Sequence, residues 1–199
     1  MQIDNRNFFP NILNDKKYKI GIEVGTYEGE FSKQILNNWD GILYSLDVWD
    51  KLSDEYVDSS NKSSVETIYK VIDNINGFED RSVLIRTSSE YGSKMFPDEY
   101  FDFVYIDANH KYEYVKNDID YWYSKIKPGG MISGHDYISD FKINDHKDHK
   151  IWVYTNKEKT ETKYCGLFGV NPAVNEFVEK HNKKLYTTNE YFGTWYIFK

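Results

Sequence analysis

The sequence has little cysteine, little proline and no long hydrophobic segment. Its 199 residues include one Cys and four Pro. A single thiol, Cys165, excludes an internal disulfide and a thiolate metal cage. No apolar run approaches the roughly 18 residues that a membrane-spanning helix needs. The first residues show no basic start followed by an apolar stretch, so we expect no secretory signal and predict a cytoplasmic protein without a membrane partner.

The chain also lacks a surplus of positive charge. Lys and Arg total 25 against 32 for Asp and Glu, which gives a formal net charge of -7. Nucleic-acid binding needs many cations to displace phosphate counterions, so we expect no nucleic-acid partner. Aromatic residues make up 18% of the sequence, enough core-forming side chains to exclude a disordered chain. The 18 tyrosines leave room for an aromatic interface, so homo-oligomerisation stays open.

What the sequence does contain is an alternation of strand and helix patterns. Short apolar segments typical of buried strands alternate with segments whose apolar residues recur at helical spacing. This alternation predicts an α/β fold with a mainly parallel sheet and helices on both faces, in one domain spanning residues 1–199. Two polar segments, 49–62 and 138–168, are expected to be inserted loops. The expected strands are 19–24, 42–48, 82–86, 101–106, 131–134, 184–188 and 194–198, and the expected helices are 31–39, 65–75, 89–96, 112–126 and 171–181.

The ends of the first three strands carry candidate ligand-binding residues, since such sheets bind ligands beyond the carboxyl ends of their strands. Glu23 and the glycine turn 25–29 follow the first strand. The glycines permit close approach of a ligand, and the acid suits an amine or sulfonium cation, although an ordinary turn explains the segment equally well. Asp47 follows the second strand at about the spacing of a ribose-binding acid. Ser88 and Ser89 would cap a helix or flank an adenine.

The fourth and fifth strands are followed by a second group of candidates. Asp107 and His110 come after one strand, and His135, Asp136 and Tyr137 come after the other. If these strands pair, two carboxylates and two imidazoles meet in one crevice. Such a group fits a metal site, an acid/base site or both.

Taken in order, these segments resemble a known family. E-V-G-T-Y-E-G, S-L-D, Y-I-D-A-N-H-K-Y, K-P-G-G and G-H-D-Y are similar to class I S-adenosylmethionine-dependent methyltransferases. The resemblance is greatest to small bacterial O-methyltransferases and to metal-dependent methyltransferases of macrolide sugars. It runs from about residue 19 to residue 199. It implies a Rossmann-like seven-stranded sheet in the order 3-2-1-4-5-7-6 with the last strand antiparallel.

The resemblance also implies a set of site residues. S-adenosylmethionine would be bound by Glu23, Gly25, Thr26, Tyr27, Gly29, Asp47, Val48, Ser88, Ser89 and Asp107. A divalent cation, Mg²⁺ or Mn²⁺, would be held by Asp107, His135 and Asp136. The relatives carry an acid at the position of His135, and an imidazole suits Mn²⁺, Fe²⁺ or Zn²⁺ better than Mg²⁺. His110 would be the base.

The expected reaction is O-methylation of a hydroxyl on a sugar, a glycan or another small molecule. His110, Asp107 and Asp136 are the expected catalytic residues, and His110, Tyr137 and Trp152 the expected substrate contacts. Aromatic residues in the two inserts, including Trp49 and Trp152, would stack on an acceptor or pack their own loops.

Three alternatives stay open. An NAD-dependent oxidoreductase would share this type of sheet, but the G-x-G-x-x-G pattern is absent. A non-catalytic nucleotide-binding protein of the same fold is the second alternative. A methyltransferase without a metal, in which His110 or His135 alone is the base, is the third.

Overall fold

The computed structural model describes residues 2–50, 64–138 and 169–199, and its centre is one seven-stranded sheet in the order β3-β2-β1-β4-β5-β7-β6. All pairings are parallel except those of β7, which runs antiparallel to both β5 and β6. This arrangement confirms the predicted strand order and the predicted antiparallel strand. The strands are β1 (Ile20–Val24), β2 (Ile42–Asp47), β3 (Ser82–Arg86), β4 (Phe101–Ile106), β5 (Ile126–Tyr137), β6 (Tyr186–Thr187) and β7 (Gly193–Phe198).

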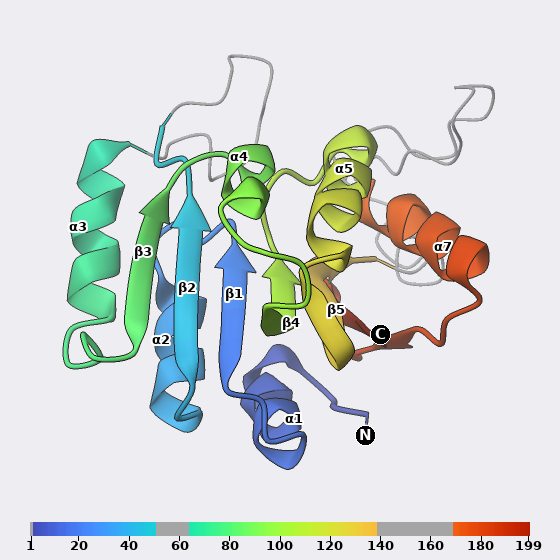
Figure 1. Cartoon of the computed structure of the whole chain (residues 1–199), viewed down its shortest axis with the longest axis horizontal. Helices are drawn as coiled ribbons and strands as arrows, with labels where there is room; N and C mark the ends of the chain where they lie inside the picture. Colours follow the sequence, from blue (N-terminus) through green and yellow to red (C-terminus); the bar gives the residue numbers. More distant parts are fainter. Residues whose placement is uncertain (1, 51–63, 139–168) are drawn as a thin grey trace.

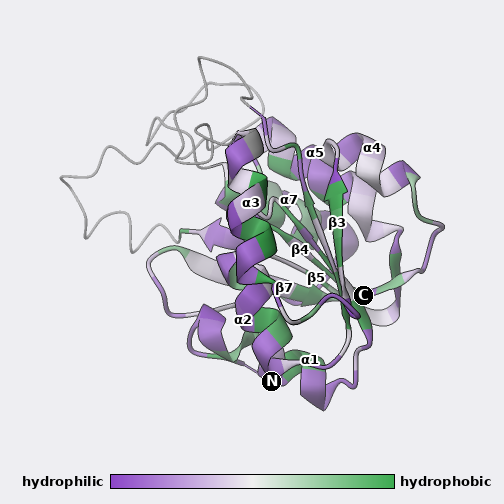
Figure 2. Cartoon of the chain, turned by 90° about the vertical axis from the view of Figure 1, so that its left-hand side faces the viewer, coloured by the Kyte–Doolittle hydropathy of each residue, from purple (hydrophilic) through white to green (hydrophobic). Residues whose placement is uncertain are grey.

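Helices cover both faces of the sheet (Figure 1). On one face lie α1 (Phe9–Asp15), α2 (Glu30–Asn38) and α3 (Val65–Asn74). On the other face lie α4 (Ser89–Lys94), α5 (Tyr112–Tyr123) and α7 (Val170–His181). In side view, hydrophobic residues concentrate on the strands that run between the helices (Figure 2).

The alternation of side chains along each strand explains the two hydrophobic cores. In β4, Val104 and Ile106 pack with α5 and α7, whereas Phe103 and Tyr105 pack with α1 and α2. Successive strand residues point to opposite faces, so a strand covered on both sides must be apolar at nearly every position. The nearly uninterrupted apolar run of β4 is therefore the reason that it lies in the middle of the sheet.

The fifth strand differs from the prediction. Helix α5 ends at Tyr123, and Ile126 already belongs to β5, where it pairs with Phe101. The predicted helix to residue 126 and the predicted strand 131–134 were therefore wrong at this junction. Ile126 continues the helical spacing of α5, but its pairing with β4 prevails, and a register irregularity accommodates Gly129 at φ 77°. At its other end β5 also extends beyond the prediction, so that His135, Asp136 and Tyr137 are the last residues of the strand itself.

The N-terminal segment contains two elements that the sequence did not predict. A short 3-10 helix, η1 (Arg6–Phe8), leads into α1, which buries Phe9, Ile12 and Leu13. The backbone N–H of Asn189 donates to the carbonyl oxygen of Asp4 at 3.0 Å. This contact fixes the segment beside the C-terminal strands and brings Arg6 to the carboxyl edge of the sheet.

The expected insert loops lie almost wholly outside the described residues. At their described margins, Trp49 is buried in the core beside α2 and α3, so it does not offer a face to an acceptor. Among the described helices, none has the length and apolar character that crossing a membrane requires.

Candidate functional site

Two adjoining cavities lie at the carboxyl edge of the sheet. The first has a volume of about 550 Å³ and the second about 410 Å³. Both are lined by Gly25, Tyr27 and Asp107, so the two cavities meet at the turn after β1 and the end of β4. Volumes in this range are typical of small-molecule sites.

The first cavity gathers most of the predicted cofactor residues. Its described lining comprises Val24, Gly25, Tyr27, Leu46, Asp47, Val48, Asp50, Thr87, Ser88, Ser89, Glu90, Asp107, Ala108, Asn109, Glu113, Tyr114, Asn117, Asp118 and Tyr121. These residues come from the ends of β1 to β4 and from one side of α5. The cavity is therefore built where ligands of this sheet class bind.

The backbone at Gly25 explains why a glycine follows β1. Gly25 has φ 93°, and a Cβ built on it would lie 2.2 Å from the carbonyl oxygen of Asp107. The backbone N–H of Asp107 donates to Val24, and that of Gly25 donates to Leu46, each at 2.8 Å. The turn after β1 is therefore packed directly against the end of β4, and only glycine fits between them.

Asp47 is held at the wall of the first cavity by backbone donors. The N–H of Tyr27 donates to its Oδ2 at 2.8 Å, and the N–H of Trp49 donates to its Oδ1 at 2.9 Å. The indole N–H of Trp49 in turn donates to the carbonyl of Tyr27 at 2.8 Å. Burial raises the pKa of Asp47, while these N–H donors oppose the rise. Each carboxylate oxygen keeps a lone pair that is able to accept a hydrogen bond from a hydroxyl group.

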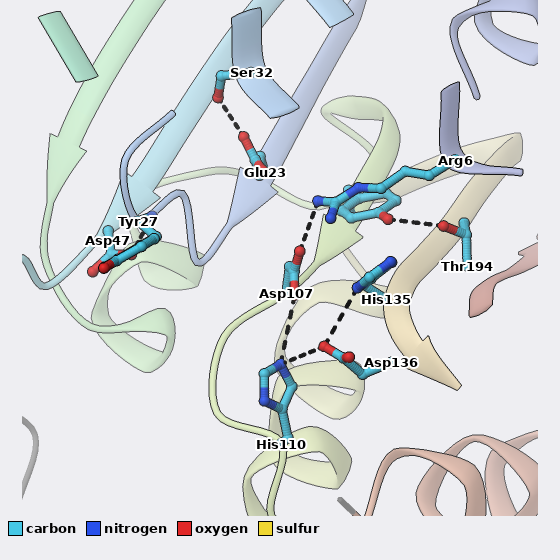
Figure 3. A network of polar contacts seen from close by, with 11 residues as sticks. Arg6, Glu23, Tyr27, Ser32, Asp47, Asp107, His110, His135, Asp136 and Thr194 are labelled. Atoms are coloured by element: carbon cyan, nitrogen blue, oxygen red, sulfur yellow. Dashed lines mark hydrogen bonds and ion pairs between the residues drawn. The ribbon is translucent and has the colours of Figure 1, made fainter. Parts of the chain in front are cut away.

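Glu23 lies behind the glycine turn and is almost fully buried. The hydroxyl of Ser32 donates to it (Figure 3). Ser32 also pairs with the hydroxyl of Ser45 at 2.8 Å. Burial raises the pKa of Glu23 to about 8, because an anion there loses its hydration. The carboxyl group is thus held at the second cavity by Ser32 of α2, which in turn contacts Ser45 of β2. Sequence reasoning missed this role of Ser32.

A cluster of acids and imidazoles lines the second cavity (Figure 3). His110 Nε2 lies 2.8 Å from Asp136 Oδ2 and 3.5 Å from Asp107 Oδ1. His135 Nδ1 lies 3.4 Å from Asp136 Oδ2. Burial opposes ionisation of Asp136, yet the two imidazoles hold its pKa far below the ordinary value. The predicted meeting of two carboxylates and two imidazoles is therefore present in the structure.

The ligand atoms of Asp107, His110 and Asp136 all lie within 4.8 Å of one another. Two carboxylates and one imidazole fit a divalent cation, and the imidazole favours Mn²⁺, Fe²⁺ or Zn²⁺ over Mg²⁺. The predicted ligand set contained His135 in place of His110. The structure brings His110 into the group, while His135 contacts it only through Asp136.

Arg6 is a site residue that sequence reasoning missed. Its Nη2 donates to Asp107 Oδ2 at 2.7 Å, and its guanidinium carbon lies 3.8 Å from the centre of the Phe31 ring. Burial opposes the charge of Arg6, but the neighbouring Asp107 and Glu23 favour it, and its pKa is raised. Asn5 and Pro10 could have indicated a helix start nearby. No local pattern pointed to a partner 101 positions away.

Asp118 was missed as well. This α5 residue is 5% exposed and lines the first cavity. Burial raises its pKa to about 7, although a hydrogen bond from Ser89 opposes the rise. Val115, Ile119 and Trp122 surround its position on the apolar face of the helix. An acid within an apolar stripe was the available signal, because such a position usually faces the core.

The remaining predicted residues divide between the site and its surroundings. Thr26 lines the second cavity. Gly29, at φ 80°, begins α2 and lies outside the described lining of both cavities. Tyr137 also lies outside that lining, and its hydroxyl donates to Asn175 at 2.9 Å. Trp152 lies outside the described residues.

Comparison with solved structures places this architecture among methyltransferases. A Staphylococcus aureus protein provisionally named a caffeoyl-CoA O-methyltransferase has 14% identity and a TM-score of 0.66, with 100% of this chain and 85% of that chain covered. An O-methyltransferase from Bacillus cereus has 14% identity and a TM-score of 0.62, with 98% and 80% covered. The O-methyltransferase TomG from Streptomyces achromogenes has 12% identity and a TM-score of 0.63, with 97% and 78% covered.

These similarities show that the chain shares its fold with methyltransferases, and a match by sequence shows the family. A family described as "methyltransferase domain" matches residues 22–137, more than half of the sequence, and the chain belongs to that family. No curated protein matches the chain by sequence. The resemblance to class I S-adenosylmethionine-dependent methyltransferases is therefore confirmed at the level of the family.

Proposed function

We propose that this protein transfers a methyl group from S-adenosylmethionine to a hydroxyl of a sugar or another small molecule. The observation that carries the proposal is the pair of cavities that meet at Gly25 and Asp107. One cavity suits a nucleoside, and the other contains the acids and imidazoles that a hydroxyl acceptor needs. Among the similar structures, the Bacillus cereus enzyme was solved with S-adenosylhomocysteine and TomG with S-adenosylmethionine.

The first cavity supplies the groups that an adenosine needs. The carboxylate of Asp47 accepts hydrogen bonds from the vicinal ribose hydroxyls, since the backbone N–H groups of Tyr27 and Trp49 fix its two oxygens. Ser88, Ser89 and Asp118 line the part of the cavity next to α4 and α5 and surround the base. The sulfonium then lies at the junction formed by Gly25 and Asp107, where negative charge favours it.

The second cavity would receive the acceptor. Methyl transfer requires the acceptor oxygen and the methyl carbon in line, and alignment supplies much of the rate acceleration. We propose that Asp107, His110 and Asp136 hold a divalent cation, with Mn²⁺ preferred over Mg²⁺. When bound, the cation lowers the pKa of the acceptor hydroxyl. Because His110 Nε2 cannot hold a cation and take a proton at once, His135 is the base in this scheme.

The scheme without a metal assigns the base differently. In that case His110 takes the proton at Nε2, and Asp136, 2.8 Å away, stabilises the resulting cation. Arg6 already balances part of the charge of Asp107 in the described structure. The two schemes share the cofactor and the reaction and differ in their need for a cation.

Transfer of a labelled methyl group from S-adenosylmethionine to a panel of vicinal diols tests the proposal. The panel would contain sugars, glycosides and catechols, assayed after EDTA treatment and after addition of Mn²⁺ or Mg²⁺. We expect transfer to at least one diol, loss with EDTA and greater recovery with Mn²⁺ than with Mg²⁺. Full activity after EDTA would replace the metal scheme by the one with His110 as base. Absence of label from every hydroxyl, with label on an amine or thiol control, would overturn O-methylation.

We propose a small-molecule or glycan acceptor, without a nucleic-acid or membrane partner, in the cytoplasm. The acidic balance of the chain and the small volume of the second cavity support this choice.

A further inference from the structure

The guanidinium of Arg6, beside the second cavity, has a buried hydrogen-bond donor without a partner among the described residues. Its Nη2 donates to Asp107, but its Nε is buried and has no hydrogen-bond partner in the described part of the chain. A guanidinium offers five N–H donors in a planar fork that matches the two oxygens of a carboxylate. A buried donor without a partner is costly, so this position fits a ligand that supplies an acceptor.

The position of Arg6 is fixed by three contacts that do not involve a ligand. Its guanidinium carbon lies 3.8 Å from the centre of the Phe31 ring and 5.2 Å from that of Tyr105. Its backbone N–H donates to Glu190 Oε2 at 2.7 Å. Phe31 belongs to the first turn of α2, directly after the glycine turn. These contacts hold the planar group beside the glycine turn before any ligand arrives.

The charges around Arg6 are otherwise negative. Among the described residues that line the second cavity, Arg6 is the only arginine or lysine. The acids of that lining are Glu23, Glu28, Glu30, Asp107 and Asp136. A ligand that carries only a carboxylate would meet strong repulsion there. A ligand with a carboxylate and an ammonium on neighbouring atoms could satisfy both signs.

We propose that Arg6 binds the α-carboxylate of the amino-acid end of the cofactor, while the acidic lining receives its ammonium group. The proposal rests on the proposed S-adenosylmethionine dependence. With the nucleoside in the first cavity, the amino-acid chain crosses the junction at Gly25 and reaches Arg6. The Arg6–Asp107 pair shows that opposite charges already lie side by side at this point, 2.7 Å apart. Arg6 lies outside the matched family segment 22–137, so this chain recruits its N-terminal segment to the cofactor site.

Calorimetric titration with three probes tests this role. S-adenosylhomocysteine carries both charges, its decarboxylated analogue lacks only the carboxylate, and 5′-methylthioadenosine lacks the amino-acid end. For the wild type we expect the decarboxylated analogue to bind about 10- to 100-fold more weakly than S-adenosylhomocysteine, because a charge-assisted bidentate contact is lost. In Arg6→Gln, S-adenosylhomocysteine should weaken by about the same factor, and the other two probes should change less than about threefold.

The control variant is Arg81→Gln. Arg81 donates to the backbone carbonyls of Trp39 and Leu36 and does not line either cavity in the described residues. Arg81→Gln should leave unchanged the ratio of the affinity for S-adenosylhomocysteine to the affinity for its decarboxylated analogue, even if the protein becomes less stable. Arg6→Lys should restore part of this ratio, because lysine keeps the positive charge but lacks the planar fork of donors.

Several results would overturn the assignment. Equal losses for all three probes in Arg6→Gln would mean a structural role. An unchanged ratio with a raised KM for an acidic acceptor would mean that Arg6 binds the acceptor instead. If the wild type binds none of the three probes, the proposed cofactor itself is wrong. That result differs from a failure of the Arg6 assignment alone, in which the wild type would still bind all three probes.

Discussion

His110 Nε2 lies 2.8 Å from Asp136 Oδ2, although His110 follows β4 and Asp136 lies at the end of β5. Parallel pairing of β4 with β5 brings them together, since Ile106 pairs with Gly134. Asp136 also has φ 60°, a left-handed conformation that residues other than glycine rarely adopt. The strand pairing thus brings the two segments together, and the contact places an acid and an imidazole in one cavity.

Asp136→Asn should weaken binding of Mn²⁺ by about 10- to 100-fold, because it removes a charged ligand from the group of Asp107, His110 and Asp136. Calorimetry or the EPR signal of free Mn²⁺ measures the affinity without an acceptor. Asp120→Asn, at an exposed position of α5, is the matched control and should bind as the wild type does. Equal affinities in both variants would exclude this cation site.

Asp107→Ala should abolish methyl transfer while the fold survives. Asp107 contacts both Arg6 and His110, so its loss removes a negative charge from the place where the proposed cofactor and acceptor sites meet. The far-UV circular dichroism spectrum should stay close to that of the wild type. Turnover with the labelled cofactor at the wild-type rate would contradict the proposed role.

Gly25→Ala should destabilise the protein more than Gly77→Ala. Both glycines have nearly the same φ, 93° and 91°, so the backbone strain of roughly 1 kcal/mol is shared. Only at Gly25 does the new Cβ meet a backbone carbonyl, at 2.2 Å, while Gly77 has open space around it. We expect an additional loss of about 2 kcal/mol or more in urea unfolding. Equal losses would show that the turn after β1 has room beside Asp107.

Asp118→Asn should flatten part of the dependence of stability on pH. Burial raises the pKa of Asp118 from 3.8 to about 7, so between these values the folded state keeps a proton that the unfolded state has lost. Stability therefore falls as pH rises from about 4 to 7, by at most about 1.4 kcal/mol per pH unit from this group. Asn stays neutral and can still accept a hydrogen bond from Ser89.

Urea unfolding at pH 4, 5.5 and 7 measures this effect. The variant should match the wild type at pH 4 and become progressively more stable than it towards pH 7. Asp120→Asn, which changes an exposed acid of the same helix, should show no such trend. A parallel pH dependence of Asp118→Asn and the wild type would mean that Asp118 ionises normally in the fold.

Much of the fold could be predicted from local patterns. The strands β1, β2, β3 and β4 are short apolar segments between turn residues, and each was predicted to within one residue. Their order followed from the family resemblance, because periodicity does not specify which strands pair. The junction at Ile126 failed for the same reason: its spacing fits α5, and only its pairing with Phe101 decides its structure.

The candidate site shows the same division. Glycine turns and acids after strands can be found locally, and the structure brings Asp47, Asp107, His110 and Asp136 to the cavities. Arg6 could not be found in this way, because its contact with Asp107 depends on how the N-terminal segment folds back over the sheet. Local patterns reveal residue types, whereas contacts between distant segments depend on the packing of the whole chain.

The cavity at the ends of β1, β2 and β4 is expected to bind S-adenosylmethionine. Calorimetric titration of the purified protein with S-adenosylhomocysteine and, separately, with NAD measures this binding. We expect one binding site for S-adenosylhomocysteine, with an affinity that Asp47→Asn lowers about 10-fold or more and that Asp40→Asn, at an exposed position, leaves unchanged. Binding of NAD without binding of S-adenosylhomocysteine would contradict it.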